Sequence, residues 1–87
     1  MKNQEEKSAN LFYGTDTYGR AIEVAIRKDG IMFWRSYGYN GYGNGWKKWE
    51  QLKEKKEVIK DNNKEFIKWG WNELSGISAN RRLPKAF

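Results

Sequence analysis

Residues 21–37 read AIEVAIRKDGIMFWRSY, and this stretch is the strongest indicator of the fold. Ile22, Val24 and Ile26 recur at every second position, as in a β-strand with one apolar face. The dipeptide Asp29-Gly30 follows and is typical of a two-residue type I′ turn between antiparallel strands. A second run rich in aromatic residues then begins. The sequence therefore predicts a β-hairpin centred on this dipeptide.

A two-residue turn fixes which residues of the hairpin oppose each other. Ile26 then pairs with Phe33, Ala25 with Trp34, and Ile22 with Tyr37. This register predicts that one face of the hairpin forms the core, while Trp34 lies on the other face. The predicted core face consists of Ile22, Val24, Ile26, Phe33 and Tyr37.

The neighbouring segments extend this hairpin into a small sheet. Leu11–Thr17 can form a first strand, and Thr15–Gly19 reads as a turn. Asn40-Gly41 and Asn44-Gly45 are further turn dipeptides that can return the chain through Trp46–Leu52. We expect three or four antiparallel strands.

The C-terminal part of the chain predicts a helix over Asn63–Ser75. Asn62 is a suitable N-cap, and Glu65 stands three residues later, as in a capping box. Gly76 suits the position that ends a helix. An apolar stripe would pack this helix on the sheet. Its members are Phe66, Ile67, Trp71 and Leu74.

The predicted fold class is therefore α+β, a small antiparallel sheet with one C-terminal helix packed on it. Residues 1–10 are polar and charged, which favours a disordered N-terminal tail. Residues 11–76 are expected to form a single small domain, since 87 residues leave no room for a second. Residues 77–87 contain Arg81, Arg82 and Lys85 without an acid and are expected to form a basic C-terminal tail.

The composition excludes several kinds of chemistry. The chain contains no histidine and no cysteine, which removes the usual general base, the thiol nucleophile and the common zinc ligands. It also lacks a phosphate-binding P-loop, a dinucleotide fingerprint and a calcium-binding loop. We therefore expect no enzyme activity, no cofactor and no metal. The absence of cysteine, of a secretory apolar segment and of a membrane-spanning run predicts a cytoplasmic protein.

Residues 31–52 contain half of the aromatic residues, with glycines and cations between them. Aromatic rings stack on bases while lysine and arginine neutralise phosphates, so this combination is typical of proteins that bind single-stranded nucleic acid. The net charge of +6 favours an anionic partner. The candidate ligand-binding residues are Trp34, Arg35, Tyr39, Tyr42, Trp46, Lys47, Lys48 and Trp49.

Other interpretations of this segment remain open. Trp, Tyr and Arg also dominate protein interfaces, so the chain fits an adaptor or an inhibitor of a larger protein complex, such as a phage or plasmid product. The tryptophans could instead form an aromatic core, and the charge could serve solubility. Asp29-Gly30-Ile31, Gly45-Trp46 and Trp49-Glu50-Gln51-Leu52 together resemble one blade of bacterial β-propeller lectins, which implies carbohydrate binding. The pattern occurs once, whereas propellers need several repeats, so it assigns no sugar-binding residue.

Overall fold

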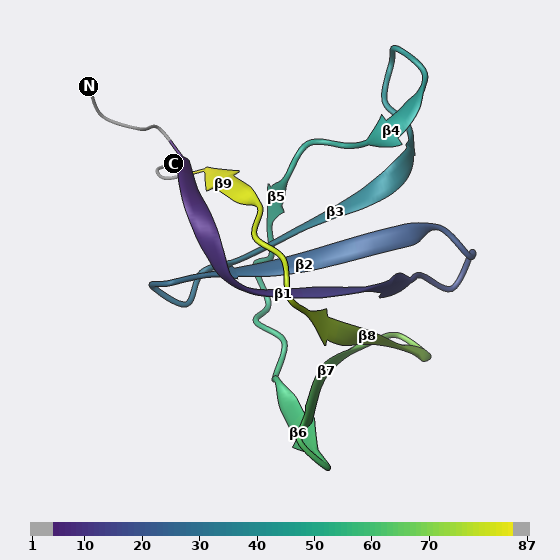
Figure 1. Cartoon of the computed structure of the whole chain (residues 1–87). Helices are drawn as coiled ribbons and strands as arrows, with labels where there is room; N and C mark the ends of the chain where they lie inside the picture. Colours follow the sequence, from purple (N-terminus) through teal and green to yellow (C-terminus); the bar gives the residue numbers. More distant parts are fainter. Residues whose placement is uncertain (1–4, 85–87) are drawn as a thin grey trace.

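The computed structural model describes residues 5–84, and this part of the chain forms an antiparallel sheet without a helix (Figure 1). The spatial order is β4-β3-β2-β1-β8-β7-β6, with β5 paired to β3 and β9 paired to β1. The predicted α+β class is therefore wrong, since the described residues are all-β. The nine strands in this range are β1 (Glu5–Thr15), β2 (Ala21–Arg27), β3 (Met32–Tyr39), β4 (Asn44–Trp46), β5 (Glu50–Gln51), β6 (Ile59–Asp61), β7 (Lys64–Trp69), β8 (Asn72–Ile77) and β9 (Arg82–Pro84).

The segment predicted as a helix, Asn63–Ser75, belongs to two consecutive hairpins. Asn62 and Asn63 connect β6 to β7 with φ angles of 51° and 65°, as the two central positions of a type I′ turn require. Gly70, with φ of 61°, and Trp71 connect β7 to β8 in the pattern of a type II′ turn. Asn62 closes a hairpin and caps no helix, because asparagine tolerates left-handed backbone as well as it caps helices.

The predicted apolar stripe divides between the two faces of the sheet and a turn. Ile67 and Leu74 oppose each other across β7 and β8, and both are fully buried. Phe66 precedes Ile67 in the strand and therefore faces the other way. Trp71 lies in the turn with 91% of its surface exposed. Spacings of one, five and eight residues fit a helix face. Here the two-residue turns before and after β7 fold the segment into hairpins instead.

The predicted hairpin of β2 and β3 is present, but its register differs by one residue. Ile26 pairs with Met32. The Gly30 N–H donates to the Arg27 carbonyl, and the Arg27 N–H donates to the Ile31 carbonyl, both at 2.8 Å. The loop thus has three residues, with a left-handed glycine (φ 90°) at its third position. This is the pattern of a type I turn followed by a bulge, and the predicted type I′ turn is wrong.

This one-residue change moves every side chain of β3 to the opposite face. Trp34 pairs with Val24 and lies on the face of the main core. Tyr37 leaves the predicted core face and is 44% exposed. Phe33 pairs with Ala25 and enters a smaller cluster on the other face.

The sheet curls around the face that carries the main core, here called the inner face. In a flat sheet β3 and β7 would be roughly 19 Å apart, because four strand spacings of about 4.8 Å separate them. The rings of Trp34 on β3 and Trp69 on β7 nevertheless have centroids only 5.5 Å apart. Leu52 and Val58, at the two ends of the connection between β5 and β6, also pack on this core. Its buried members are Phe12, Ile22, Val24, Ile26, Met32, Ile67 and Leu74.

The opposite, outer face carries a second and smaller core. Leu11, Ala25 and Phe33 are buried there beneath Leu83 of β9. Backbone pairing of β9 with Glu5–Lys7 brings this C-terminal segment onto the sheet. The structure thus places Glu5–Asn10, part of the predicted N-terminal tail, in β1, and part of the predicted C-terminal tail in β9. Ile77 of the predicted C-terminal tail belongs to β8. Residues 1–4 and 85–87 of the two predicted tails lie outside the described residues.

Candidate functional site

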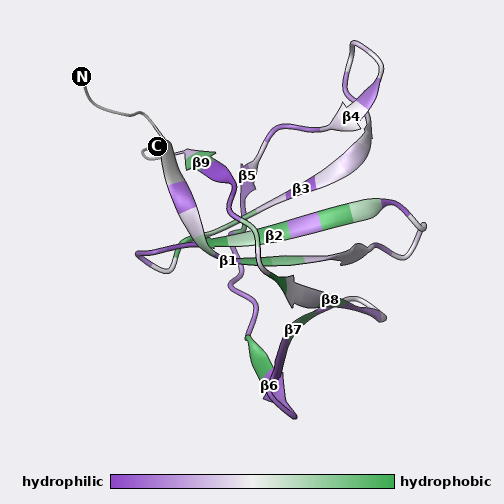
Figure 2. Ribbon diagram, viewed as in Figure 1, coloured by the Kyte–Doolittle hydropathy of each residue, from purple (hydrophilic) through white to green (hydrophobic). Residues whose placement is uncertain are grey.

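The outer face is apolar around Leu11, Ala25 and Phe33, but towards the β3–β4 loop it carries aromatic and charged side chains. β2 is mostly apolar (Figure 2), but its third residue, Glu23, is charged. Glu23 is opposed by Tyr13 of β1 on one side and by Arg35 of β3 on the other. Alternation along β3 brings Tyr37 and Tyr39 onto the same face as Arg35. The register of three strands therefore gathers rings and charges on one surface.

Glu23 is the electrostatic centre of this surface. Its side chain is only 1% exposed, and both carboxylate oxygens have a guanidinium partner. Nε of Arg35 donates to Oε1 at 2.9 Å, and Nη2 of Arg81 donates to Oε2 at 3.0 Å. A buried carboxylate requires such partners, because the desolvation of an unpaired charge is strongly unfavourable. One negative charge thus fixes two positive charges at the outer face.

Arg35 is also held between two tryptophan rings. Its guanidinium carbon lies 4.7 Å from the ring centroid of Trp46 and 4.4 Å from that of Trp49. Trp46 in turn meets the edge of Tyr37, with centroids 5.5 Å apart and planes at 90°. Tyr13 approaches Trp46 with a centroid distance of 6.4 Å. The rings are therefore preorganised by contacts with one another and with a cation.

We call this surface the outer aromatic face. Its members are Tyr13, Arg35, Tyr37, Tyr39, Trp46 and Trp49.

The loop between β3 and β4 extends beyond this face. Tyr39, at the end of β3, is 70% exposed, and Tyr42, at the tip of the loop, is 99% exposed. The Asn40 N–H donates to the Gly43 carbonyl at 3.0 Å, and the Asn40 side chain accepts a hydrogen bond from the Tyr42 N–H. Gly43 has a φ of 145°, in the region that favours glycine. The end of β3 and the adjoining loop thus present two tyrosines, Tyr39 and Tyr42, to solvent.

The structure brings together only part of the predicted site. Arg35, Tyr39, Trp46 and Trp49 belong to the outer aromatic face, while Tyr42 lies in the adjoining loop. Lys48 is exposed between Trp46 and Trp49 in the sequence. Two predicted residues point elsewhere. Trp34 packs against the inner core. Lys47 points to the face of the sheet opposite to Trp46, since its Cε lies 3.8 Å from the position that a Cβ on Gly38 would occupy.

The sequence prediction missed Tyr13, Glu23 and Arg81 and placed Tyr37 in the core. The alternation of the strands could have found Glu23, because a lone acid in the apolar run AIEVAI has to be paired if it is buried. No local pattern indicates Arg81. It reaches Glu23 across 58 positions of the sequence, through the pairing of the C-terminal segment with β1.

Two other exposed aromatic residues lie in turns at the end of the sheet that also carries the β3–β4 loop. Tyr18 in the β1–β2 turn is 82% exposed, and the neighbouring β7–β8 turn carries Trp71. Burial raises the pKa of Asp16 in the first turn, but hydrogen bonds from the backbone N–H groups of Arg20 and Tyr18 and from the Arg20 guanidinium outweigh this effect. The pKa of Asp16 is therefore below its ordinary value, and the ionised carboxylate holds this turn together.

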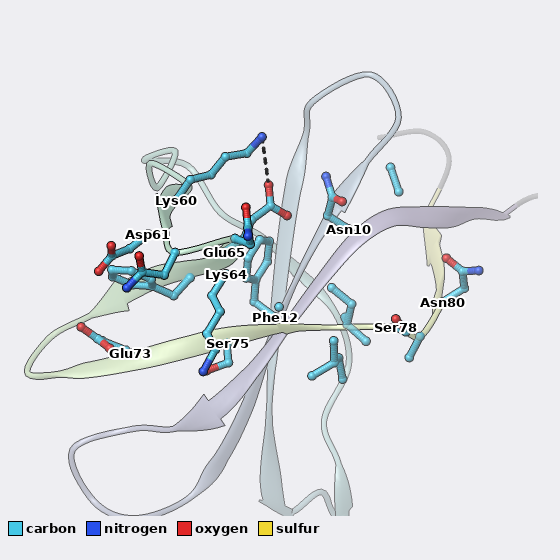
Figure 3. A pocket seen from close by; sticks show the side chains of 18 residues that line it. Asn10, Phe12, Lys60, Asp61, Lys64, Glu65, Glu73, Ser75, Ser78 and Asn80 are labelled. Carbon is cyan, nitrogen blue, oxygen red and sulfur yellow. Dashed lines mark ion pairs between the residues drawn. The ribbon is translucent and has the colours of Figure 1, made fainter.

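A shallow depression lies between the β6–β7 hairpin and strands β1 and β8 (Figure 3). Amide and hydroxyl groups of Asn10, Ser75 and Asn80 line it, and Lys60 forms an ion pair of 3.8 Å with Glu65. Among residues 5–84, no group of three or more acidic side chains is arranged to hold a metal ion. The depression gathers mixed charges and neutral polar groups, whereas the outer aromatic face combines rings with cations.

The described part of the chain contains no helix that is long and apolar enough to cross a membrane. No protein-family model matches this chain, and neither a curated protein nor a solved structure matches it significantly.

Proposed function

We propose that this protein is a non-catalytic, cytoplasmic module that binds single-stranded nucleic acid on the outer aromatic face. The observation that carries the proposal is the row of exposed tyrosines, Tyr37 and Tyr39, beside a Trp46–Arg35–Trp49 stack that is already ordered. Each ring can stack on a base irrespective of its identity. Because contacts hold Tyr37, Trp46 and Trp49 before binding, little side-chain entropy is lost when these three rings stack.

Charge supports the same partner. Glu23 neutralises one of its two arginines, which leaves one positive charge on the face. Lys48 is exposed and forms no ion pair within residues 5–84. Together with the net charge of +6, these cations favour a polyanion. Unpaired bases are required, because the rings can reach base faces only where the bases are not stacked in a duplex.

The test is the affinity for a fluorescent single-stranded oligonucleotide at low salt, measured by anisotropy. Tyr39→Ala should weaken binding by roughly 5- to 150-fold, since stacking of one base contributes about 1–3 kcal/mol. The matched control is Trp71→Ala, which removes a ring that is even more exposed than Tyr39 and lies outside the outer aromatic face, so the affinity should stay unchanged. An absence of binding by the wild-type protein would refute the proposal, as would equal effects of both variants.

The exposed turns favour a second candidate, a protein partner. Tyr18 and Trp71 lie on adjacent turns. The side-chain amide of Asn72 donates to the Thr15 carbonyl, and a Cβ on Gly70 would lie 3.4 Å from Cγ2 of Thr17. Exposed tyrosine and tryptophan are typical hot spots of protein interfaces. For this candidate, Trp71→Ala should abolish the capture of a specific protein that Tyr39→Ala retains. The opposite pattern would exclude these turns as the interface.

A further inference from the structure

Arg81 pairs with Glu23 on the outer face although it comes from the C-terminal segment. Its backbone is fixed to β1 on both sides, because its N–H donates to Oγ of Ser8 at 3.0 Å and its carbonyl accepts the Ser8 N–H at 2.9 Å. Its guanidinium is fixed by Glu23. The side chain still exposes 34% of its surface, against 17% for Arg35. Arg81 is thus a positioned cation that remains accessible to solvent.

We propose that Arg81 is a phosphate-binding residue that contacts one backbone phosphate of the bound strand. This inference rests on the proposed function. Glu23 carries a single negative charge, and Arg35 already supplies a positive charge for it. Arg81 therefore brings one charge in excess to the surface. Guanidinium has five N–H donors, and Arg81 uses Nη2 towards Glu23 and Nη1 towards the Asn80 carbonyl at 3.3 Å.

The fixed guanidinium suits a phosphate better than a freely moving lysine would. The N–H donors that Arg81 does not use towards Glu23 and Asn80 can meet two phosphate oxygens at once, in the planar geometry that arginine favours. Because Glu23 opposes Tyr13 and Arg35 in the sheet, a phosphate bound here lies beside the rings of the outer aromatic face. The contact would set the position of the strand while the rings stack on its bases.

The experiment compares the salt dependence of oligonucleotide affinity for the wild type, Arg81→Gln, Arg81→Lys and Lys28→Gln. Lys28→Gln is the matched control, because it removes the same net charge from an exposed residue in the β2–β3 turn, at the other end of β3. Loss of one phosphate contact should reduce the slope of log K against log[salt] by about 0.7 in Arg81→Gln. If the wild type and Arg81→Gln bind equally at 1 M salt, this difference in slope makes Arg81→Gln bind roughly eightfold more weakly than the wild type at 50 mM salt. Lys28→Gln should change affinity less than twofold, and Arg81→Lys should restore the slope.

Thermal melts check that each variant is folded, and Arg81→Gln should be folded because it leaves the pair of Glu23 with Arg35 intact. Equal slopes in Arg81→Gln and Lys28→Gln would overturn the role of Arg81 and leave the proposed function standing. Absence of oligonucleotide binding by the wild type would instead overturn the proposed function. In that case the binding of inorganic tripolyphosphate, which has no bases, tests whether Arg81 binds phosphate by itself. Binding that weakens at least fivefold in Arg81→Gln supports the site, and equal binding by both proteins overturns it.

Discussion

Replacement of Glu23 by glutamine tests whether one buried carboxylate holds the outer aromatic face in place. The change removes the negative charge that accepts hydrogen bonds from Arg35 at 2.9 Å and from Arg81 at 3.0 Å, and it replaces one of the two accepting oxygens with an amide NH2 group that cannot accept. Bonds to charged groups contribute about 1.5–3 kcal/mol each. We assign about 2 kcal/mol to the bond from Arg35, which is mostly buried, and about 1 kcal/mol to the bond from the more exposed Arg81, because solvent screens it. The expected loss of unfolding free energy is about 3 kcal/mol.

The assay is thermal unfolding followed by circular dichroism. A domain of this size has a stability of roughly 4–13 kcal/mol, and 1 kcal/mol shifts its Tm by about 4–8 °C. Glu23→Gln should therefore lower the Tm by about 12–24 °C. Glu54→Gln makes the same change in charge at an exposed position of the β5–β6 connection and should lower it by less than about 4 °C. Equal shifts in both variants would refute the central role of Glu23.

Three further predictions test the fold. Trp34→Ala should cost about 2–3 kcal/mol in urea unfolding because its ring packs on the inner core, while exposed Trp71→Ala should cost less than about 0.5 kcal/mol; the reverse order would mean that the register of β3 is misassigned. Asn63→Val should lower stability by about 1–2 kcal/mol, since φ is 65°, whereas Asn63→Gly should not lower it. If residue 63 lay in a helix, Asn63→Gly would be less stable than Asn63→Val. Because the pKa of Asp16 is lowered in the folded state, its contribution is full above the unfolded pKa of about 3.9 and is lost as pH falls through the folded value. Stability of Asp16→Asn measured between pH 6 and pH 2 should therefore decline less on acidification, and an unchanged decline would contradict this role.

The comparison of Trp34 with Tyr37 explains why the sequence located the site only in part. The alternation in β2 was readable, and so was the presence of a hairpin after it. The register of that hairpin depends on whether the loop has two residues or three, and Asp29-Gly30 is compatible with both. Here Gly30 adopts the left-handed conformation after a type I turn, so every side chain of β3 changes face. Trp34 then enters the core and Tyr37 the surface.

The C-terminal half posed a different ambiguity. Phe66, Ile67 and Leu74 fit an amphipathic helix, and Asn62 is a good residue at a helix N-terminus as well as in a hairpin turn. Isolated two-stranded hairpins are marginal in water, so local sequence alone could not select this structure. Pairing of β8 with Leu11–Tyr13 of β1 stabilises the hairpin by burying Ile67 and Leu74 on the inner face.

The sequence by itself determined that histidine and thiol chemistry is absent, that the chain is basic, and that residues 31–52 concentrate rings and cations. It also determined the strand character of β2. Only the tertiary structure decided which rings share a surface and that Arg81 meets Glu23 there. The physical reason is that these contacts follow from strand pairing between distant segments, and the register of that pairing depends on turn geometry and on burial across the whole sheet.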